Sequence, residues 1–64
     1  MSYYYIYKNT PFDGDNLVAV AVNEIDAEYM ATCLSLEAGT TLYINKSTNY
    51  YAVCSNGAYQ VIYS

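Results

Sequence analysis

Residues 23–39, Asn-Glu-Ile-Asp-Ala-Glu-Tyr-Met-Ala-Thr-Cys-Leu-Ser-Leu-Glu-Ala-Gly, predict a helix with both of its ends marked. The Asn23 side chain can accept a hydrogen bond from a backbone N–H of the first turn, and Asp26, three residues later, completes a capping box. Acidic residues near its start complement the positive end of the helix dipole. Gly39 suits the left-handed conformation that ends many helices, so we expect the helix over 24–38.

Two strands are expected before this helix. Residues 3–8, Tyr-Tyr-Tyr-Ile-Tyr-Lys, are rich in the aromatic and β-branched side chains that favour strands. Residues 17–22, Leu-Val-Ala-Val-Ala-Val, alternate large and small side chains, and valine is a poor helix former. Pro11 and Gly14 indicate that residues 9–16 form a loop between the two strands.

Three more strands are expected after the helix, and the clearest signal among them is the dipeptide Asn56-Gly57. A type I′ turn needs positive φ at both central positions, which asparagine and glycine adopt most readily. The strands are predicted at 40–45, 50–55 and 58–63, with a turn at 46–49. The order β-β-α-β-β-β makes residues 1–64 a single small α+β domain, with one helix packed on one face of a mostly antiparallel sheet.

The tight turn also determines which residues of the last hairpin lie opposite each other. On one face the expected pairs are Cys54 with Tyr59, Ala52 with Val61 and Tyr50 with Tyr63. On the other face they are Val53 with Gln60 and Tyr51 with Ile62. We assign the face without strongly polar residues to the helix side, where small side chains such as Ala52 and Cys54 would allow a close approach. Alternation along the strands then predicts the helix side as Tyr4, Ile6, Leu42, Ile44, Tyr50, Ala52, Cys54, Tyr59, Val61 and Tyr63.

The opposite face of the sheet is predicted to be unusually aromatic. Its expected members are Tyr3, Tyr5, Tyr7, Tyr43, Tyr51, Val53 and Ile62. A solvated face normally carries charged and polar residues instead. Tyrosine gives a large, rigid contact area with a polar tip and is enriched at interfaces, so we interpret these residues as an interaction surface. Two alternatives stay open: strand propensity with simple packing, and stacking on a sugar.

The helix has a narrow polar side. At 100° per residue, Glu24, Glu28, Thr32 and Ser35 share an arc of about 80°, and most of the remaining circumference is apolar. One sheet cannot cover so wide an apolar surface. The sequence therefore predicts a second uncovered flank, made by Ile25, Tyr29 and Leu36.

No arrangement of residues indicates catalysis. The chain has no histidine to act as a base, and two cysteines cannot complete a four-ligand zinc site. There is no glycine-rich phosphate loop. Calcium at Asp13, Asp15 and Asn16 would lack the EF-hand spacing, so a solvated turn is the preferred interpretation. We therefore expect no enzyme activity, no cofactor and no metal.

Charge disfavours two further kinds of partner. Six acidic residues against Lys8 and Lys46 give a net charge of −4. Two lysines far apart cannot form the basic track that binds nucleic acid or an anionic membrane. The longest aliphatic run, residues 17–22, is too short to span a bilayer. No leader segment is recognised, and Cys33 and Cys54 lie in apolar stretches typical of buried free thiols, so we expect a cytoplasmic protein.

These expectations favour a non-catalytic interaction protein that forms a homodimer and docks on a larger protein target. A short, tyrosine- and asparagine-rich chain without a motif resembles small reading frames of phage genomes. That resemblance implies an accessory or inhibitor protein in the host cytoplasm, and it assigns no residue. The alternative is a small-ligand or carbohydrate-binding module that uses the tyrosine-rich face of the sheet.

Overall fold

The computed structural model describes residues 3–47 and 50–63, and in them it shows one helix on a five-stranded sheet. The elements are β1 (Tyr4–Tyr7), β2 (Leu17–Ala21), α1 (Glu24–Ala38), β3 (Thr41–Ser47), β4 (Tyr50–Ser55) and β5 (Ala58–Tyr63). The strands lie in the order β2-β1-β3-β4-β5, and every neighbouring pair is antiparallel. The predicted α+β class and element order are therefore confirmed.

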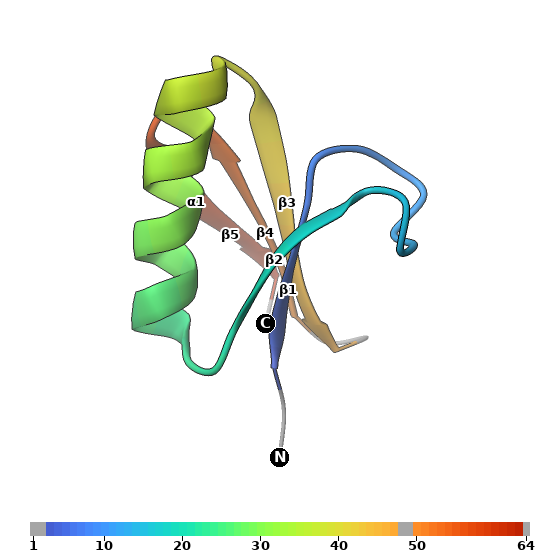
Figure 1. The fold of residues 1–64 in the computed structure, drawn as a ribbon. Helices are drawn as coiled ribbons and strands as arrows, with labels where there is room; N and C mark the ends of the chain where they lie inside the picture. The colour runs from blue at the N-terminus through green and yellow to red at the C-terminus, as the bar shows by residue number, and fades with distance from the viewer. Residues whose placement is uncertain (1–2, 48–49, 64) are drawn as a thin grey trace.

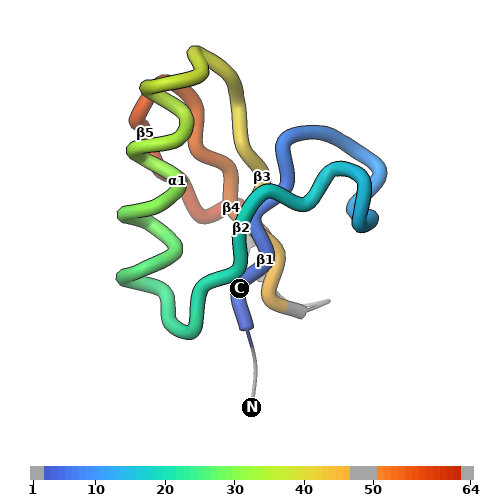
Figure 2. The backbone as a smooth tube through the Cα atoms, in the orientation of Figure 1, coloured from blue at the N-terminus to red at the C-terminus, as the bar shows by residue number. Residues whose placement is uncertain are grey.

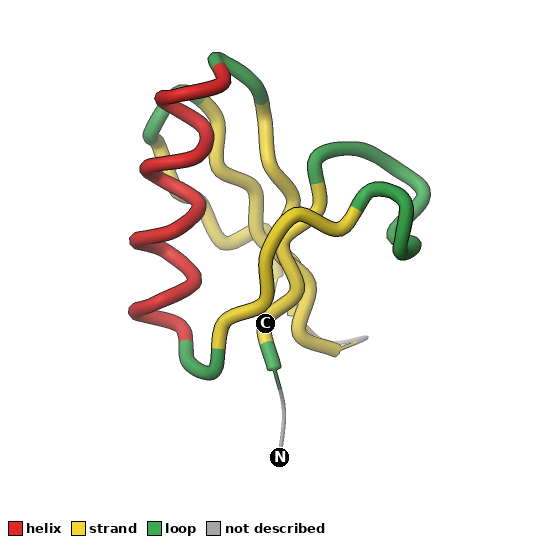
Figure 3. Tube along the Cα trace, viewed as in Figure 1, coloured by secondary structure: helices red, strands yellow, loops and turns green. Residues whose placement is uncertain are grey.

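The helix and the long loop lie on opposite sides of the sheet. In Figure 1, α1 stands on one side of the strands, and the loop between β1 and β2 projects on the other side. The tube in Figure 2 follows the same path from β1 through this loop into β2. Figure 3 separates the single helix, the strands and the connecting segments by colour. The sheet thus has one face under α1 and an opposite face towards which the loop over residues 9–16 projects.

Both ends of α1 form as the sequence predicts. The Asp26 backbone N–H donates to Asn23 Oδ1 at 2.8 Å, and Asn23 Nδ2 donates to Asp26 Oδ2 at 3.3 Å. At the other end Gly39 has φ 64°, and its N–H donates to the Ser35 carbonyl at 2.9 Å. These bonds satisfy backbone groups that the helix itself leaves without partners.

Replacing the cap residue tests this account. Asn23→Ala should lower the free energy of unfolding by about 1 kcal/mol, because the amide acceptor for the Asp26 N–H is lost. In a domain of this size the melting temperature should fall by about 4–8 °C. Asn23→Ser is the matched control, since serine also caps helices and should retain most of the stability. Thermal unfolding followed by circular dichroism checks both variants, and equal melting of Asn23→Ala and wild type would contradict the cap.

The hairpin of β4 and β5 begins as predicted and then changes register. Asn56 and Gly57 both have positive φ, 52° and 86°, as a type I′ turn needs. Cys54 pairs with Tyr59, Val53 with Gln60, and Ala52 with Val61, all as expected.

The predicted pairing of Tyr51 with Ile62 is wrong, and so is that of Tyr50 with Tyr63. Tyr51 pairs with Tyr63, and a register shift lies between Tyr51 and Ala52. Such a bulge leaves one extra residue, here Ile62, without a partner on the opposite strand, so strict alternation no longer assigns Ile62 to a face.

Strand β3 extends further than the sequence indicates. The predicted turn at 46–49 overlaps it, because Lys46 and Ser47 belong to the strand and Ser47 pairs with Tyr50. A register shift lies between Asn45 and Ser47, and the pairing of Ser47 with β4 overrides the weak strand propensity of this segment. Residues 48 and 49 of the predicted turn, and the predicted inward side chains of Tyr50 and Tyr63, lie outside the described part.

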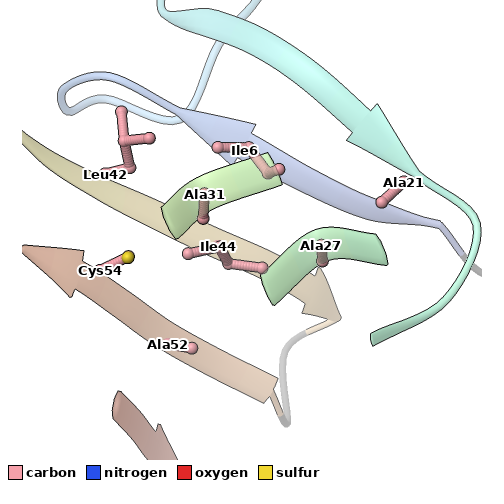
Figure 4. Packing of buried hydrophobic residues seen from close by; sticks show 8 residues of the cluster. All are labelled: Ile6, Ala21, Ala27, Ala31, Leu42, Ile44, Ala52 and Cys54. Carbon is pink, nitrogen blue, oxygen red and sulfur yellow. The ribbon is translucent and has the colours of Figure 1, made fainter. Parts of the chain in front are cut away.

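The core between α1 and the sheet is small and rich in alanine. Figure 4 shows its eight residues: Ile6, Ala21, Ala27, Ala31, Leu42, Ile44, Ala52 and Cys54. Tyr4 and Tyr59 pack against it, as expected, whereas Val61 remains exposed on the edge strand β5. The large side chains that are fully buried come from the sheet, whereas the fully buried residues of α1 are small. Met30 and Leu34 of α1 pack against this core and are partly buried.

Ser35 is placed differently from the prediction. The polar arc assigned it to solvent, but Ser35 is fully buried and continues the row of Ala27 and Ala31 that faces the sheet. Burial is possible because its hydroxyl has partners: it donates to the Thr32 carbonyl at 3.1 Å and accepts from the Gly57 N–H at 2.8 Å. The buried Cys54 sulfur lies 3.4 Å away. Ser35 therefore ties α1 to the β4–β5 turn.

Candidate interaction surfaces

The sheet face away from α1 brings most of the predicted surface residues together. Tyr7 pairs with Tyr43, and Tyr43 pairs with Val53, so these side chains lie on neighbouring strands. The rings of Tyr43 and Tyr51 are nearly parallel, with centroids 6.3 Å apart. Tyr5, Tyr7, Tyr43, Tyr51 and Val53 are all half-buried, whereas Tyr3 and Ile62 are exposed. We call Tyr5, Tyr7, Tyr43, Tyr51 and Val53 the tyrosine face.

The sequence did not reveal that Phe12 also belongs to this surface. Its ring centroid lies 5.0 Å from that of Tyr7, 5.8 Å from Tyr51 and 6.0 Å from Tyr43. Such separations are typical of favourable aromatic pairs. Phe12 comes from the loop over residues 9–16, and the available signal was a single phenylalanine within an otherwise polar loop. The aromatic contact holds this loop against the sheet.

The loop has its own hydrogen bonds that fold it back. The Lys8 N–H donates to the Asn16 carbonyl at 2.8 Å, and Asn16 Nδ2 donates to the Pro11 carbonyl at 2.8 Å. Asp13 Oδ1 accepts from the backbone N–H groups of Asp15 and Asn16. These bonds form the turn that the sequence indicated, and the Asp13 carboxylate is used within it.

The tyrosine face continues onto the edge strand β2. Ala19 and Ala21 of this strand pack towards the core, so Val20 between them points to the other side, where it is exposed. Val20 pairs with Tyr5. The described strand residues that alternate with the buried ones are all uncharged: Tyr5, Tyr7, Val20, Thr41, Tyr43, Asn45, Tyr51, Val53, Ser55 and Gln60. An uncharged sheet face with an aromatic centre is a candidate contact surface.

A second apolar surface runs along α1 on the side away from the sheet. Ile25 is 80% exposed, Tyr29 71% and Leu36 57%, and Cys33 between them is also exposed. Their spacing of four, four and three residues puts all four on one side of a helix. We call Ile25, Tyr29, Cys33 and Leu36 the helix stripe. Its exposure confirms the predicted uncovered flank.

The helix turns its small residues inward because the space above the sheet is already filled. Ile6, Leu42 and Ile44 occupy it from the sheet, so the residues of α1 that are fully buried are the small Ala27, Ala31 and Ser35. Met30 and Leu34 pack against the core but remain partly exposed. The larger apolar residues Ile25, Tyr29 and Leu36 are left outside. Leu36 marks one end of the stripe beside the hairpin turn, because a Cβ added at Gly57 would lie 3.0 Å from its Cγ.

The helix stripe is surrounded by negative charge. Residues 24–38 contain Glu24, Asp26, Glu28 and Glu37 and neither of the two lysines. Lys46 lies with its Nζ 5.4 Å from the centre of the Tyr4 ring, near the end of β3. The helix thus carries a formal charge equal to the −4 of the whole chain.

No related protein identifies this chain: comparisons with protein-family models, curated proteins and solved structures find no match.

The two thiols are both free, as expected, but only one is buried. Cys54 lies in the core, whereas the predicted burial of Cys33 is wrong. Cys33 is on the helix side opposite Ala31 and Ser35, and an apolar run cannot reveal which side of a helix meets the sheet.

The described residues contain neither a cavity nor a group of three side chains of histidine, cysteine, aspartate or glutamate able to hold a metal ion. Within the same ranges, 3–47 and 50–63, no helix has the length and apolar character needed to cross a membrane. The features of the described surface that suggest contact are therefore the tyrosine face and the helix stripe.

Proposed function

We propose that this protein is a non-catalytic protein–protein interaction module that forms a homodimer through the tyrosine face. The observation that carries the proposal is the uncharged sheet surface in which Tyr7, Tyr43, Tyr51 and Phe12 form one aromatic cluster. Tyrosine is enriched at interfaces because its ring supplies contact area and its hydroxyl tolerates water.

The small core supports self-association. Its eight apolar residues include four alanines, whereas larger apolar side chains such as Val18, Val20 and Ile62 remain exposed. Burying such residues against a partner stabilises the folded chain by mass action. A typical stable interface buries about 800 Å² per partner. That is about a fifth of the 4007 Å² accessible surface.

Charge favours the tyrosine face over the helix stripe as the surface that meets its own copy. A two-fold dimer places the same patch of both chains together. Pairing two helix stripes would bring two helices with four acidic residues each into proximity, which like-charge repulsion opposes. The tyrosine face has no such charge among its described strand residues.

Sedimentation velocity tests the homodimer. Wild type should sediment as a dimer, and Tyr43→Glu or Tyr5→Glu should weaken the dimer about tenfold or more, because each places a carboxylate in the interface. Glu28→Lys, which alters the helix but not the tyrosine face, should leave the dimer intact. Circular dichroism of each variant verifies that it remains folded. A wild type that sediments as a monomer at high concentration would refute the homodimer.

Two further elements complete the proposal. The free thiols Cys33 and Cys54 fit a reducing compartment, so we assign the protein to the cytoplasm, as an accessory or inhibitor protein that acts on a larger target. A carbohydrate stacked on the tyrosine face is the alternative. A monomeric wild type that shifts its tyrosine fluorescence on addition of a sugar would favour it.

A further inference from the structure

The helix stripe has apolar residues in the middle and acidic residues at both margins. On a helical projection Glu28 lies about 60° to one side of Ile25, and Asp26 lies about 60° to the other side of Tyr29. Glu37 lies on the same side as Asp26, about 40° beyond Cys33. All three acidic residues are exposed. A partner that covers the stripe therefore meets carboxylates on both sides of its contact.

The charge pattern selects the chemistry of that partner. No lysine of this chain belongs to α1, so a second copy of the stripe would bring acids against acids. Lysine or arginine beside an apolar row would instead pair with carboxylates on both margins, and complementary charge steers association and excludes wrong partners.

The shape of the stripe suits a helix. From Ile25 to Leu36 it spans twelve residues, or about 16 Å along the axis, as three turns of an accompanying helix would. An amphipathic helix carries its apolar residues in a row of the same width. Helices laid on an apolar face in this way are a common mode of peptide recognition.

We propose that the helix stripe docks a basic amphipathic helix of a partner protein. The apolar residues of that helix cover Ile25, Tyr29 and Leu36, and its lysine or arginine residues face Glu28 and Glu37. The tyrosine face lies on the other side of the sheet, so this contact is independent of the proposed homodimer and remains accessible within it.

A defined peptide provides the test. The probe is a fluorescent amphipathic peptide of about 18 residues, with leucines in one row and lysines on both sides of it. The control peptide keeps the leucines and replaces each lysine by glutamate. Fluorescence anisotropy with the full chain should show saturable binding of the lysine peptide, weakening as salt rises, and at least about tenfold weaker binding of the glutamate peptide.

Variants of the protein locate the contact. Ile25→Gln and Tyr29→Gln should each weaken the lysine peptide about tenfold, and glutamine at these exposed positions is compatible with a helix. Glu28→Gln and Glu37→Gln should each weaken it and reduce its salt dependence. Asp15→Asn is the matched control, because it changes the net charge equally but lies in the loop, and it should have no effect.

Cys33 gives a second readout at the stripe itself. In the native protein a maleimide should modify exposed Cys33 much faster than buried Cys54. Bound lysine peptide should slow the reaction of Cys33, whereas the glutamate peptide should not.

Three outcomes would overturn the proposal. If the lysine and glutamate peptides bind equally, or if neither binds, the partner of the stripe is not a basic helix. Unchanged binding to Ile25→Gln and Tyr29→Gln would remove the stripe. If wild type is a dimer and the Tyr29→Gln variant is a monomer, the stripe binds a second copy of the chain instead. If Tyr43→Glu abolishes the dimer but still binds the lysine peptide, the two surfaces act independently, as proposed.

Discussion

Ile44→Ala is expected to lower the free energy of unfolding by about 2–5 kcal/mol, because it deletes most of a fully buried side chain. Ile44 lies on β3, the central strand, and pairs with Ile6 on one side and Ala52 on the other. Figure 4 shows it among the side chains of the core. Its small neighbours cannot expand to fill the cavity, so the cost should approach the upper end of this range.

The consequence should be large for so short a chain. A domain of 64 residues has a total stability of roughly 3–10 kcal/mol. Ile44→Ala should therefore remove a major part of it and populate unfolded molecules at room temperature. Urea unfolding at fixed protein concentration measures the loss, because dimerisation would make stability concentration-dependent.

Ile25→Ala is the matched control, with the same change of side chain at a position 80% exposed. It should leave stability unchanged within about 0.5 kcal/mol or raise it slightly, since alanine is the better helix former. Similar losses in Ile44→Ala and Ile25→Ala would contradict the described position of the helix on the sheet.

Ala31→Leu should cost about 1–3 kcal/mol through overpacking. Ala31 is fully buried in the middle of the row that α1 presents to the sheet, between Ala27 and Ser35. A leucine there would have to push α1 away from the sheet. That movement would lengthen the 2.8 Å hydrogen bond from the Gly57 N–H to Ser35 Oγ, so the hairpin turn should be disturbed as well.

The control for this substitution is Ala38→Leu, at the exposed last residue of α1. It should change the midpoint of urea unfolding little. Hydrogen exchange of the Gly57 amide adds a local readout, which should be faster in Ala31→Leu than in wild type or Ala38→Leu. A stability of Ala31→Leu equal to that of Ala38→Leu would show that the helix does not approach the sheet as closely as described.

Local signals in the sequence were sufficient for most of the elements. The cap at Asn23 and the left-handed Gly39 mark α1 because each satisfies backbone groups within a few residues. The positive φ of Asn56 and Gly57 forms the last turn for the same local reason. The end of β3 is not predictable from propensity, because it is the pairing of Ser47 with Tyr50, beyond a register shift at Lys46, that extends the strand.

The candidate surfaces were predictable to a smaller extent. Alternation correctly separated Tyr43 from Leu42 and Ile44, because a strand places successive side chains on opposite faces. It failed at Ile62, where a bulge interrupts the pairing of β4 and β5. Phe12 could not be assigned, since nothing local indicates that a loop folds back onto the sheet.

The order of the elements, the ends of α1 and the alternation of most strands can therefore be predicted, because they depend on neighbours along the chain. Which side of α1 is buried depends instead on packing between distant segments. The helix is apolar around most of its circumference, so periodicity did not distinguish the row of Ala27, Ala31 and Ser35 from the helix stripe. The choice depends on the volume left above Ile6, Leu42 and Ile44, in which small side chains are buried completely and the larger Met30 and Leu34 only in part.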